Sequence, residues 1–139
     1  MYSRLLIFVF IVCSCSQNKP DRAFYYWKTT FRISDSDKKI LSDLEIKKLY
    51  VRFFDVDWDV NSNSAVPVSE ILFANKVPSG IQIIPVVYLT NKSLIKISDS
   101  EVFPLAGKIY HLVNSMASSN DILFSELQID CDWSENTKE

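Results

Sequence analysis

Residues 81–89 read IQIIPVVYL and are apolar at almost every position. A continuous apolar run of this length is typical of a strand in a parallel sheet, which is covered on both faces. Three further segments are predicted as strands because they are rich in aromatic and β-branched residues or end in them: residues 23–31, 49–54 and 123–133. The fold is therefore expected to be built around a parallel sheet.

Helices are predicted between these strands. Residues 34–47 begin with Ser and Asp capping candidates and carry apolar residues on one face. Residues 67–74 begin with Pro67, which suits the first helical position. Residues 100–117 repeat apolar side chains at helical spacing, and Pro104 places the start of this helix within residues 100–104. The order β-α-β-α-β-α-β predicts parallel strands joined by crossovers.

This order predicts an α/β fold, a partial (β/α) barrel of about four parallel βα units. Such a unit count is half of a (β/α)8 barrel, which takes about 250 residues. A small open parallel α/β sheet is the alternative. Residues 134–139 read as the cap and first turn of a further helix, so we expect a truncated chain. Truncation predicts an uncovered strand edge and uncovered apolar groups.

The first residues are typical of an export signal. Arg4 precedes an apolar run at residues 5–12, which is much shorter than the roughly 20 residues of a membrane span. The pattern Val12-x-Ser14-Cys15 resembles the lipobox of bacterial lipoproteins. In that family a signal peptidase cuts before the cysteine, and the cysteine thiol carries a diacylglycerol. The alternatives are a plain secretory signal cut nearby and a retained hydrophobic start.

The lipobox resemblance implies three parts of the chain. They are a signal peptide at residues 1–14, a tether at residues 15–22 and the partial barrel domain at residues 23–139. Cys15 becomes the lipidated first residue, and the domain is expected on the cell envelope, anchored to a membrane by the lipid. Cys131 is then the one cysteine inside the domain, so no internal disulfide is expected.

Composition and charge argue against several classes of partner and cofactor. The chain has 139 residues, of which 47% are apolar and 23% charged, and its net charge is −2. Cleavage before Cys15 removes 14 residues, including Arg4, and leaves 125 residues at a charge of −3. This acidic balance does not favour nucleic acid as a partner. One His and two Gly provide neither a histidine relay nor a phosphate-binding loop, so no cofactor is predicted. No pattern indicates an oligomeric state.

Two predicted strands end in the same acidic pattern. Residues 55–58 read DVDW and residues 130–133 read DCDW. The carboxyl ends of parallel strands are where α/β folds form their sites. We therefore expect the acidic groups of both strands to meet at one rim. The candidate residues are Asp130 and Asp132 as catalytic acids, and Arg52, Asp55, Asp57, Trp58, Glu126 and Trp133 as binding residues.

Alternation along the strands predicts which side chains share a face. The expected sets are Glu126, Gln128, Asp130 and Asp132 on the last strand; Tyr50, Arg52 and Phe54 on the second; and Tyr26, Lys28 and Thr30 on the first. Lys28 and Arg52 could then neutralise Glu126 and Asp130. One interpretation is a structural network of ion pairs that fills the interior. The other is a carbohydrate site, with tryptophan rings stacking on sugars and paired carboxylates acting on a glycosidic bond.

No metal site is predicted. Acidic and amide side chains alternate over residues 55–63, as in a calcium-binding loop. The EF-hand pattern requires Gly at its sixth position and Glu at its twelfth. Val60 and Val66 occupy those positions, so the EF-hand is rejected.

The end of the last strand resembles the chitinase-type signature D-x-x-D-x-D-x-E. Asp130 and Asp132 match its D-x-D, whereas Leu127 stands at the first Asp position and Ser134 at the position of the proton-donating Glu. The resemblance implies a glycoside-hydrolase-like site that lacks its acid. We expect little or no hydrolytic activity from this chain alone.

A broader resemblance covers most of the expected mature chain. YYW at residues 25–27, LYVRFFDVDWD at 49–59, PVVYL at 85–89 and LQIDCDW at 127–133 resemble uncharacterised bacterial lipoproteins with a barrel-like, glycoside-hydrolase-like domain. Longer members of that family continue past the last of these stretches. The resemblance implies surface anchoring and a domain that binds or cleaves glycans when full length. The alternative is a non-catalytic structural or binding lipoprotein.

Overall fold

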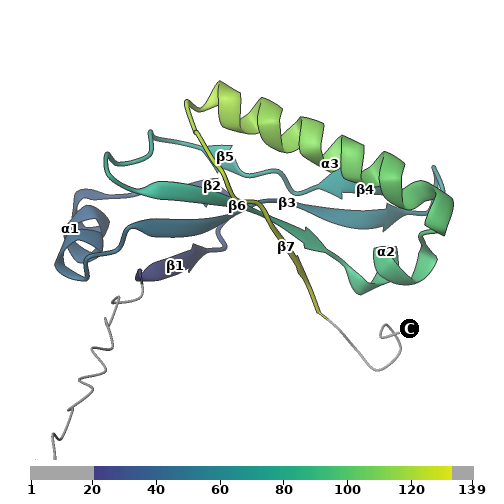
Figure 1. The fold of residues 1–139 in the computed structure, drawn as a ribbon, viewed down its shortest axis with the longest axis horizontal. Helices are drawn as coiled ribbons and strands as arrows, with labels where there is room; N and C mark the ends of the chain where they lie inside the picture. The colour runs from purple at the N-terminus through teal and green to yellow at the C-terminus, as the bar shows by residue number, and fades with distance from the viewer. Residues whose placement is uncertain (1–20, 133–139) are drawn as a thin grey trace, which may run out of the picture.

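The computed structural model describes residues 21–132, in which helices cover the outer face of a curled parallel sheet (Figure 1). Cys15 and Trp133 lie outside the described residues. In chain order the elements are β1 (Ala23–Tyr26), β2 (Thr30–Phe31), α1 (Asp35–Asp43), β3 (Lys48–Asp59), β4 (Ser64–Val68), β5 (Leu72–Phe73), β6 (Gln82–Leu89), α2 (Asn91–Lys96), α3 (Asp99–Ser119) and β7 (Gln128–Cys131).

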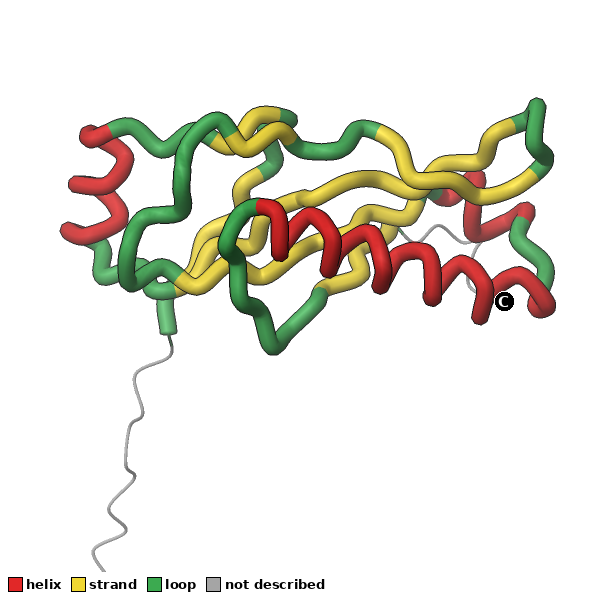
Figure 2. The backbone as a smooth tube through the Cα atoms, turned by 90° about the horizontal axis from the view of Figure 1, so that it is seen from above, coloured by secondary structure: helices red, strands yellow, loops and turns green. Residues whose placement is uncertain are grey.

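The main sheet has the order β1-β3-β6-β7, and these four strands are parallel. β4 pairs antiparallel with the second half of β3, and β2 and β5 form a separate parallel pair. Figure 2 shows α3 running along the sheet, with α1 and α2 at its opposite ends. Four parallel strands that curl in this way form half of a barrel, so the predicted partial (β/α) barrel is confirmed.

Contacts between strands that are not neighbours show how strongly the sheet curls. The Tyr25 hydroxyl on β1 donates to Gln128 Oε1 on β7 at 3.1 Å, although β3 and β6 lie between them. In a flat sheet, strands three places apart would lie roughly 14 Å apart, with parallel side chains that could not meet. The face that carries Tyr25 and Gln128 is therefore the concave face of the sheet.

Strand register assigns the remaining side chains to the two faces, because directly paired residues point the same way. The concave face carries Tyr25, Tyr50, Arg52, Asp55, Tyr88, Gln128 and Asp130. The outer face carries the main apolar core. There, Val51, Val56 and Val87 pack with Ile109 and Val113 of α3.

A β-bulge at Phe53 changes which residues of β3 reach the core. Arg52 pairs with Val86 and Phe54 pairs with Val87, so one extra residue is accommodated between them. Phe54 consequently lies on the outer face, fully buried, and the predicted sharing of a face by Arg52 and Phe54 is wrong. The bulge also brings Asp55 to the concave face, which simple alternation from Arg52 would not do.

The predicted helix at residues 67–74 is wrong, because this segment contains the end of β4 and all of β5. β4 returns along β3 as a hairpin in which Pro67 pairs with Val56. Proline is tolerated there because β4 is an edge strand of the described sheet, and one side of an edge strand needs no ladder hydrogen bond. The connection from β3 to β6 therefore uses strands where a helix was predicted.

Other predicted elements differ mainly in length. The predicted strand at residues 23–31 divides into β1 and β2, and the predicted strand at residues 123–133 is confined to Gln128–Cys131. The long helix is confirmed; it begins at Asp99 and continues through Pro104. α2, which was not predicted, starts after Thr90, whose side chain accepts a hydrogen bond from the Ser93 backbone N–H.

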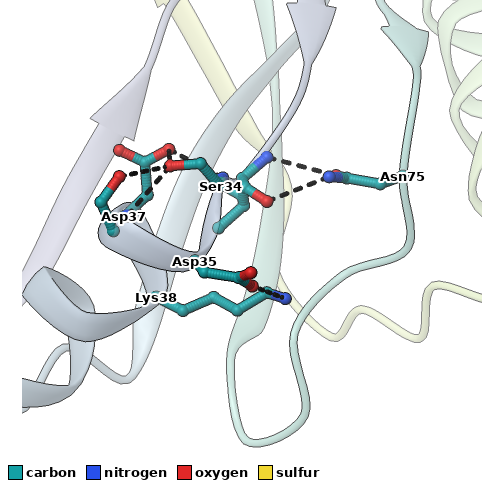
Figure 3. A network of polar contacts seen from close by, with 7 residues as sticks. Ser34, Asp35, Asp37, Lys38 and Asn75 are labelled. Atoms are coloured by element: carbon teal, nitrogen blue, oxygen red, sulfur yellow. Dashed lines mark hydrogen bonds and ion pairs between the residues drawn. The ribbon is translucent and has the colours of Figure 1, made fainter.

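Local polar contacts explain why α1 begins at Asp35 (Figure 3). Ser34 and Asp37 form a capping box, in which each side chain accepts from the other residue's backbone N–H. Asn75, from the segment after β5, uses its side-chain amide to bind both the backbone N–H and the carbonyl of Ile33. These bonds hold the chain before α1 against the segment that follows β5. The helix itself ends at Asp43, four residues before the predicted end at residue 47.

The two outermost parallel strands leave apolar groups uncovered. Phe24 on β1 is 43% exposed and Ile129 on β7 is 47% exposed, and both lie on the outer face by register. Leu123, before β7, is 92% exposed. Uncovered edges of this kind were expected from half of a barrel. Among residues 21–132, no helix combines the length and apolar character that a membrane span requires.

Candidate functional site

Three tyrosines on three different strands lie on the concave face and donate hydrogen bonds to β7 or to the residues that flank it. Tyr25 on β1 donates to Gln128, as described above. The Tyr50 hydroxyl on β3 donates to Glu126 Oε1 at 3.0 Å, and the Tyr88 hydroxyl on β6 donates to Asp132 Oδ2 at 2.8 Å. The concave face is therefore lined by phenol groups that meet acidic or amide acceptors.

The Tyr88 phenol lies at the centre of the acidic groups. Asp55 on β3 and Asp130 on β7 both pair with Tyr88 in register, one on each side. The hydrogen bond to Asp132, burial and the negative charges of Asp132, Asp55 and Asp130 all raise the pKa of Tyr88 above its ordinary value of 10.0. Acidic side chains from an early and a late strand thus approach one another around a single hydroxyl.

Arg52 and Asp55 form an ion pair on the concave face. Both Nε and Nη2 of Arg52 donate to the Asp55 carboxylate. This bond raises the pKa of Arg52 and keeps the guanidinium charged. The pair depends on the bulge at Phe53, because residues three apart on a regular strand point to opposite faces. The guanidinium also lies 5.9 Å from the centre of the Trp27 ring.

The partners of Glu126 differ from those expected. Glu126 meets the phenol of Tyr50, and this bond raises the pKa of Tyr50. Lys28 follows the end of β1 and lies 6.0 Å over the ring of Tyr26. Tyr26 itself lies on the outer face, because it pairs with Val51. The predicted shared face of Tyr26 and Lys28 inside the sheet is therefore wrong, since β1 ends at Tyr26.

Asp57 has different hydrogen-bond partners from Asp55. Its Oδ1 accepts from Thr90 Oγ1 at 2.8 Å and from the Trp58 backbone N–H at 2.8 Å, and these bonds lower the pKa of Asp57. Thr90 is the residue that caps α2. Asp57 thus connects the end of β3 to the start of α2.

Trp58 is unavailable as a stacking surface. The residue is 6% exposed and belongs to the outer-face core, where Lys96 lies 5.7 Å over its ring. The prediction that Trp58 lies at the site is wrong, because the bulge shifts the even-numbered residues after it to the core side. Trp133, the other predicted stacking residue, lies outside the described residues.

Trp27 supplies the aromatic surface that sequence reasoning missed. It is 43% exposed, and its ring stacks on that of Tyr25 with centres 6.0 Å apart and an angle of 21° between the planes. Tyr25 contacts Tyr50 in turn, with ring centres 5.0 Å apart. The signal was present in YYW at residues 25–27, because Trp27 directly follows the carboxyl end of the first strand.

The described residues offer hydrogen bonding and stacking as their chemistry. Over residues 21–132, no group of three or more His, Cys, Asp or Glu is arranged to hold a metal ion. Asp59, part of the calcium-like pattern, accepts hydrogen bonds from Ser62 and from backbone N–H groups of the following turn. The exposed Tyr25–Trp27 stack beside carboxylates is suited to a polar ligand with a flat apolar face.

Comparison with family models, with curated proteins and with solved structures found no match to the chain. The concave face and the N-terminal sequence pattern are therefore the features from which function can be inferred.

Proposed function

We propose that this protein is a lipid-anchored protein of the cell envelope whose concave face binds a glycan. The observation that carries the binding role is the stack of Tyr25 and Trp27 at the carboxyl end of β1, beside the carboxylates around Tyr88. The Trp27 ring lies nearly perpendicular to that of Tyr88, with ring centres 6.4 Å apart. Pyranose rings present flat C–H faces to aromatic rings and hydroxyl groups to carboxylates. The same surface therefore offers both kinds of contact that a sugar requires.

Binding accounts for the observed contacts better than cleavage. Glycoside hydrolysis uses two carboxyl groups, one as acid and one as base or nucleophile. Asp55 is already neutralised by Arg52, and Asp132 already accepts from Tyr88. These contacts give the two carboxylates a structural role. Catalysis by Asp130 and Asp132 stays a prediction, tested by whether the chain releases reducing ends from a glycan and whether Asp130→Asn abolishes that release.

The binding role is tested with the full chain in detergent micelles and two neutral probes, chitotetraose and cellotetraose. Tryptophan fluorescence and calorimetry measure the affinity. Trp27→Ala is expected to weaken binding about fivefold or more, because an aromatic stacking partner contributes about 1 kcal/mol beyond its buried area. Tyr110→Ala is the matched control, since Tyr110 is an exposed aromatic residue on α3.

Equal losses of affinity in Trp27→Ala and Tyr110→Ala would contradict a site on the concave face. Absence of binding to both probes, in a protein with a native far-ultraviolet dichroism spectrum, would contradict the choice of neutral glycans.

The anchoring role rests on Cys15 and is tested by fractionation. Cys15→Ala is expected to move the protein from the membrane fraction to the soluble fraction, because the variant lacks the thiol that would carry the lipid. Cys13→Ala is the matched control and should stay with the membrane. Retention of Cys15→Ala in the membrane fraction would count against the lipobox interpretation.

A further inference from the structure

The ring of Trp27 is held by side-chain contacts, because Trp27 lies just beyond the β1 ladder. β1 ends at Tyr26, which pairs with Val51 of β3. Trp27 follows as part of the connection to β2, so no strand pairing places it. The residue after Val51 is Arg52. Continuing the register by one position therefore brings Trp27 and Arg52 side by side on the concave face.

Three side chains from three strands surround the Trp27 indole. The Tyr25 ring on β1 stacks on it with centres 6.0 Å apart, and the Tyr88 ring on β6 meets it nearly edge-on at 6.4 Å. The guanidinium carbon of Arg52 on β3 lies 5.9 Å from the ring centre. All three distances are within the ranges over which aromatic pairs and cation–π pairs attract. Trp27 is still 43% exposed, so part of its surface stays open to a ligand.

Arg52 can hold the ring because its own guanidinium is fixed. The Arg52 side chain is 22% exposed, and both Nε and Nη2 donate to the Asp55 carboxylate. Two parallel bonds fix the plane of a guanidinium as well as its position. The bulge at Phe53 makes this pair possible, since it brings Asp55 to the face of Arg52. A carboxylate on β3 thus determines where the cation beside Trp27 lies.

We propose that Arg52 is a positioning residue, which together with Asp55 holds the Trp27 indole between Tyr25 and Tyr88 before a ligand binds. A side chain that already occupies its bound position loses little conformational freedom on binding, so the affinity is higher. The effect on affinity rests on the proposed glycan-binding function. The placement of the ring does not, and it can be measured without any ligand.

The test is nuclear magnetic resonance of the full chain in detergent micelles, without ligand. Nuclear Overhauser contacts are expected between the ring protons of Trp27 and those of Tyr25 and Tyr88. Arg52→Gln should weaken or abolish the contact with Tyr88, because the ring is then free to leave. Arg52→Lys keeps the charge without the paired bonds and should weaken the contact less. Asp55→Asn should act in the same direction as Arg52→Gln, since the guanidinium loses its charged acceptor.

Trp58 and Lys28 supply the controls. The contact of the Trp58 ring with the side chain of Lys96 should persist in every variant, which shows that the fold is retained. Lys28→Gln removes a cation that lies over the neighbouring Tyr26 ring and should leave the contacts of Trp27 unchanged.

Contacts of Trp27 that stay unchanged in Arg52→Gln would overturn the proposal. If Arg52→Gln also loses the Trp58 contact, the isosteric Asp55→Asn decides, and unchanged Trp27 contacts in that variant would overturn the proposal. Loss of the Trp58 contact in both variants would show that the ion pair supports the whole fold, and would overturn it as well.

Binding of cellotetraose, measured by calorimetry, tests the effect on affinity. Arg52→Gln should weaken binding about two- to fivefold, the size of one cation–π contact. In the Trp27→Ala background, Arg52→Gln should weaken binding no further, because Arg52 acts through the ring. An equal further loss would show that Arg52 contacts the ligand directly and would overturn the positioning role. Absence of binding by the unsubstituted chain would count against the proposed function, while the resonance contacts would still decide what places Trp27.

Discussion

Tyr88 on β6 is where acidic residues from the two flanking strands, β3 and β7, meet. Its phenol donates to Asp132 and lies between Asp55 and Asp130 in the sheet register. Loss of the phenol proton would break the hydrogen bond to Asp132 and would place a further negative charge, partly buried, among these carboxylates. The lost hydrogen bond, the burial and the charge repulsion, in that order, raise the pKa of Tyr88 in the folded protein.

The raised pKa predicts how stability depends on pH. Between pH 10 and the higher folded pKa, the folded state keeps a proton that the unfolded state loses. The stabilisation by this proton is therefore complete below pH 10 and is lost as the pH rises above it. Urea unfolding at pH 9 and pH 11 should show a smaller fall in the free energy of unfolding for Tyr88→Phe than for the unsubstituted protein.

Tyr110→Phe, on an exposed surface of α3, is the control and should retain the full fall. Equal falls for Tyr88→Phe and the unsubstituted protein would show that Tyr88 does not titrate as described.

At the scale of the element, α3 is a 21-residue helix that covers the outer face of the sheet with Ile109, Val113 and Ala117. Its start is set by Ser98 and Glu101, which form a capping box. Gly107 lies in the middle of this helix, and no atom would meet a Cβ there within 4 Å. The helix therefore includes a residue that lowers its stability without a packing reason.

Gly107→Ala is expected to raise the free energy of unfolding by about 0.5–1 kcal/mol, because alanine loses less backbone entropy in a helix. Urea denaturation measures the change. Gly80→Ala is the matched control and should be destabilising, because Gly80 has a φ of +81°, which side chains disfavour. A loss of stability in Gly107→Ala would contradict the open space around that position.

β7 is a short element whose position depends on side chains as well as on its ladder with β6. It has four residues and one paired edge within the described sheet. Tyr25, Tyr50 and Tyr88 reach it or its flanking residues from three other strands. The curl of the sheet is therefore linked to hydrogen bonds that cross its concave face.

At the scale of the whole molecule, these three bonds predict how the half-barrel opens. The combined change of Tyr25, Tyr50 and Tyr88 to Phe should accelerate hydrogen exchange of the β7 amides about tenfold or more, since each bond contributes about 0.5–1.5 kcal/mol. The amides of β3 that bond to β6 should keep their protection, because the apolar core holds these strands.

Unchanged exchange in β7 would show that the ladder with β6 alone holds this strand. A uniform increase over β3 and β6 as well would indicate global destabilisation.

Much of the architecture was predictable from local patterns. The apolar stretch at residues 81–89 is the central strand β6, and the apolar repeat at residues 100–117 is the core of α3. The acidic endings at Asp55 and Asp130 were expected to meet at one rim, and the sheet register places both beside Tyr88. These predictions succeed because periodicity and strand direction are properties of short segments.

The errors concern effects that depend on neighbouring strands. The hairpin of β3 and β4 overrode the helical start suggested by Pro67, because pairing along an edge strand tolerates proline. The bulge at Phe53 places Trp58 in the core and brings Asp55 to the same face as Arg52, where the two residues form an ion pair. A bulge depends on how two strands fit together, so alternation within one strand cannot predict it.

The sequence by itself determined the alternation of strands with helices that makes the sheet parallel, and the long helix, because each depends only on which residues follow one another. Only the tertiary structure decided that Trp27 replaces Trp58 beside the carboxylates and that tyrosines on three strands converge on β7. The physical reason is the curl of the sheet, which brings together side chains from strands that are not neighbours.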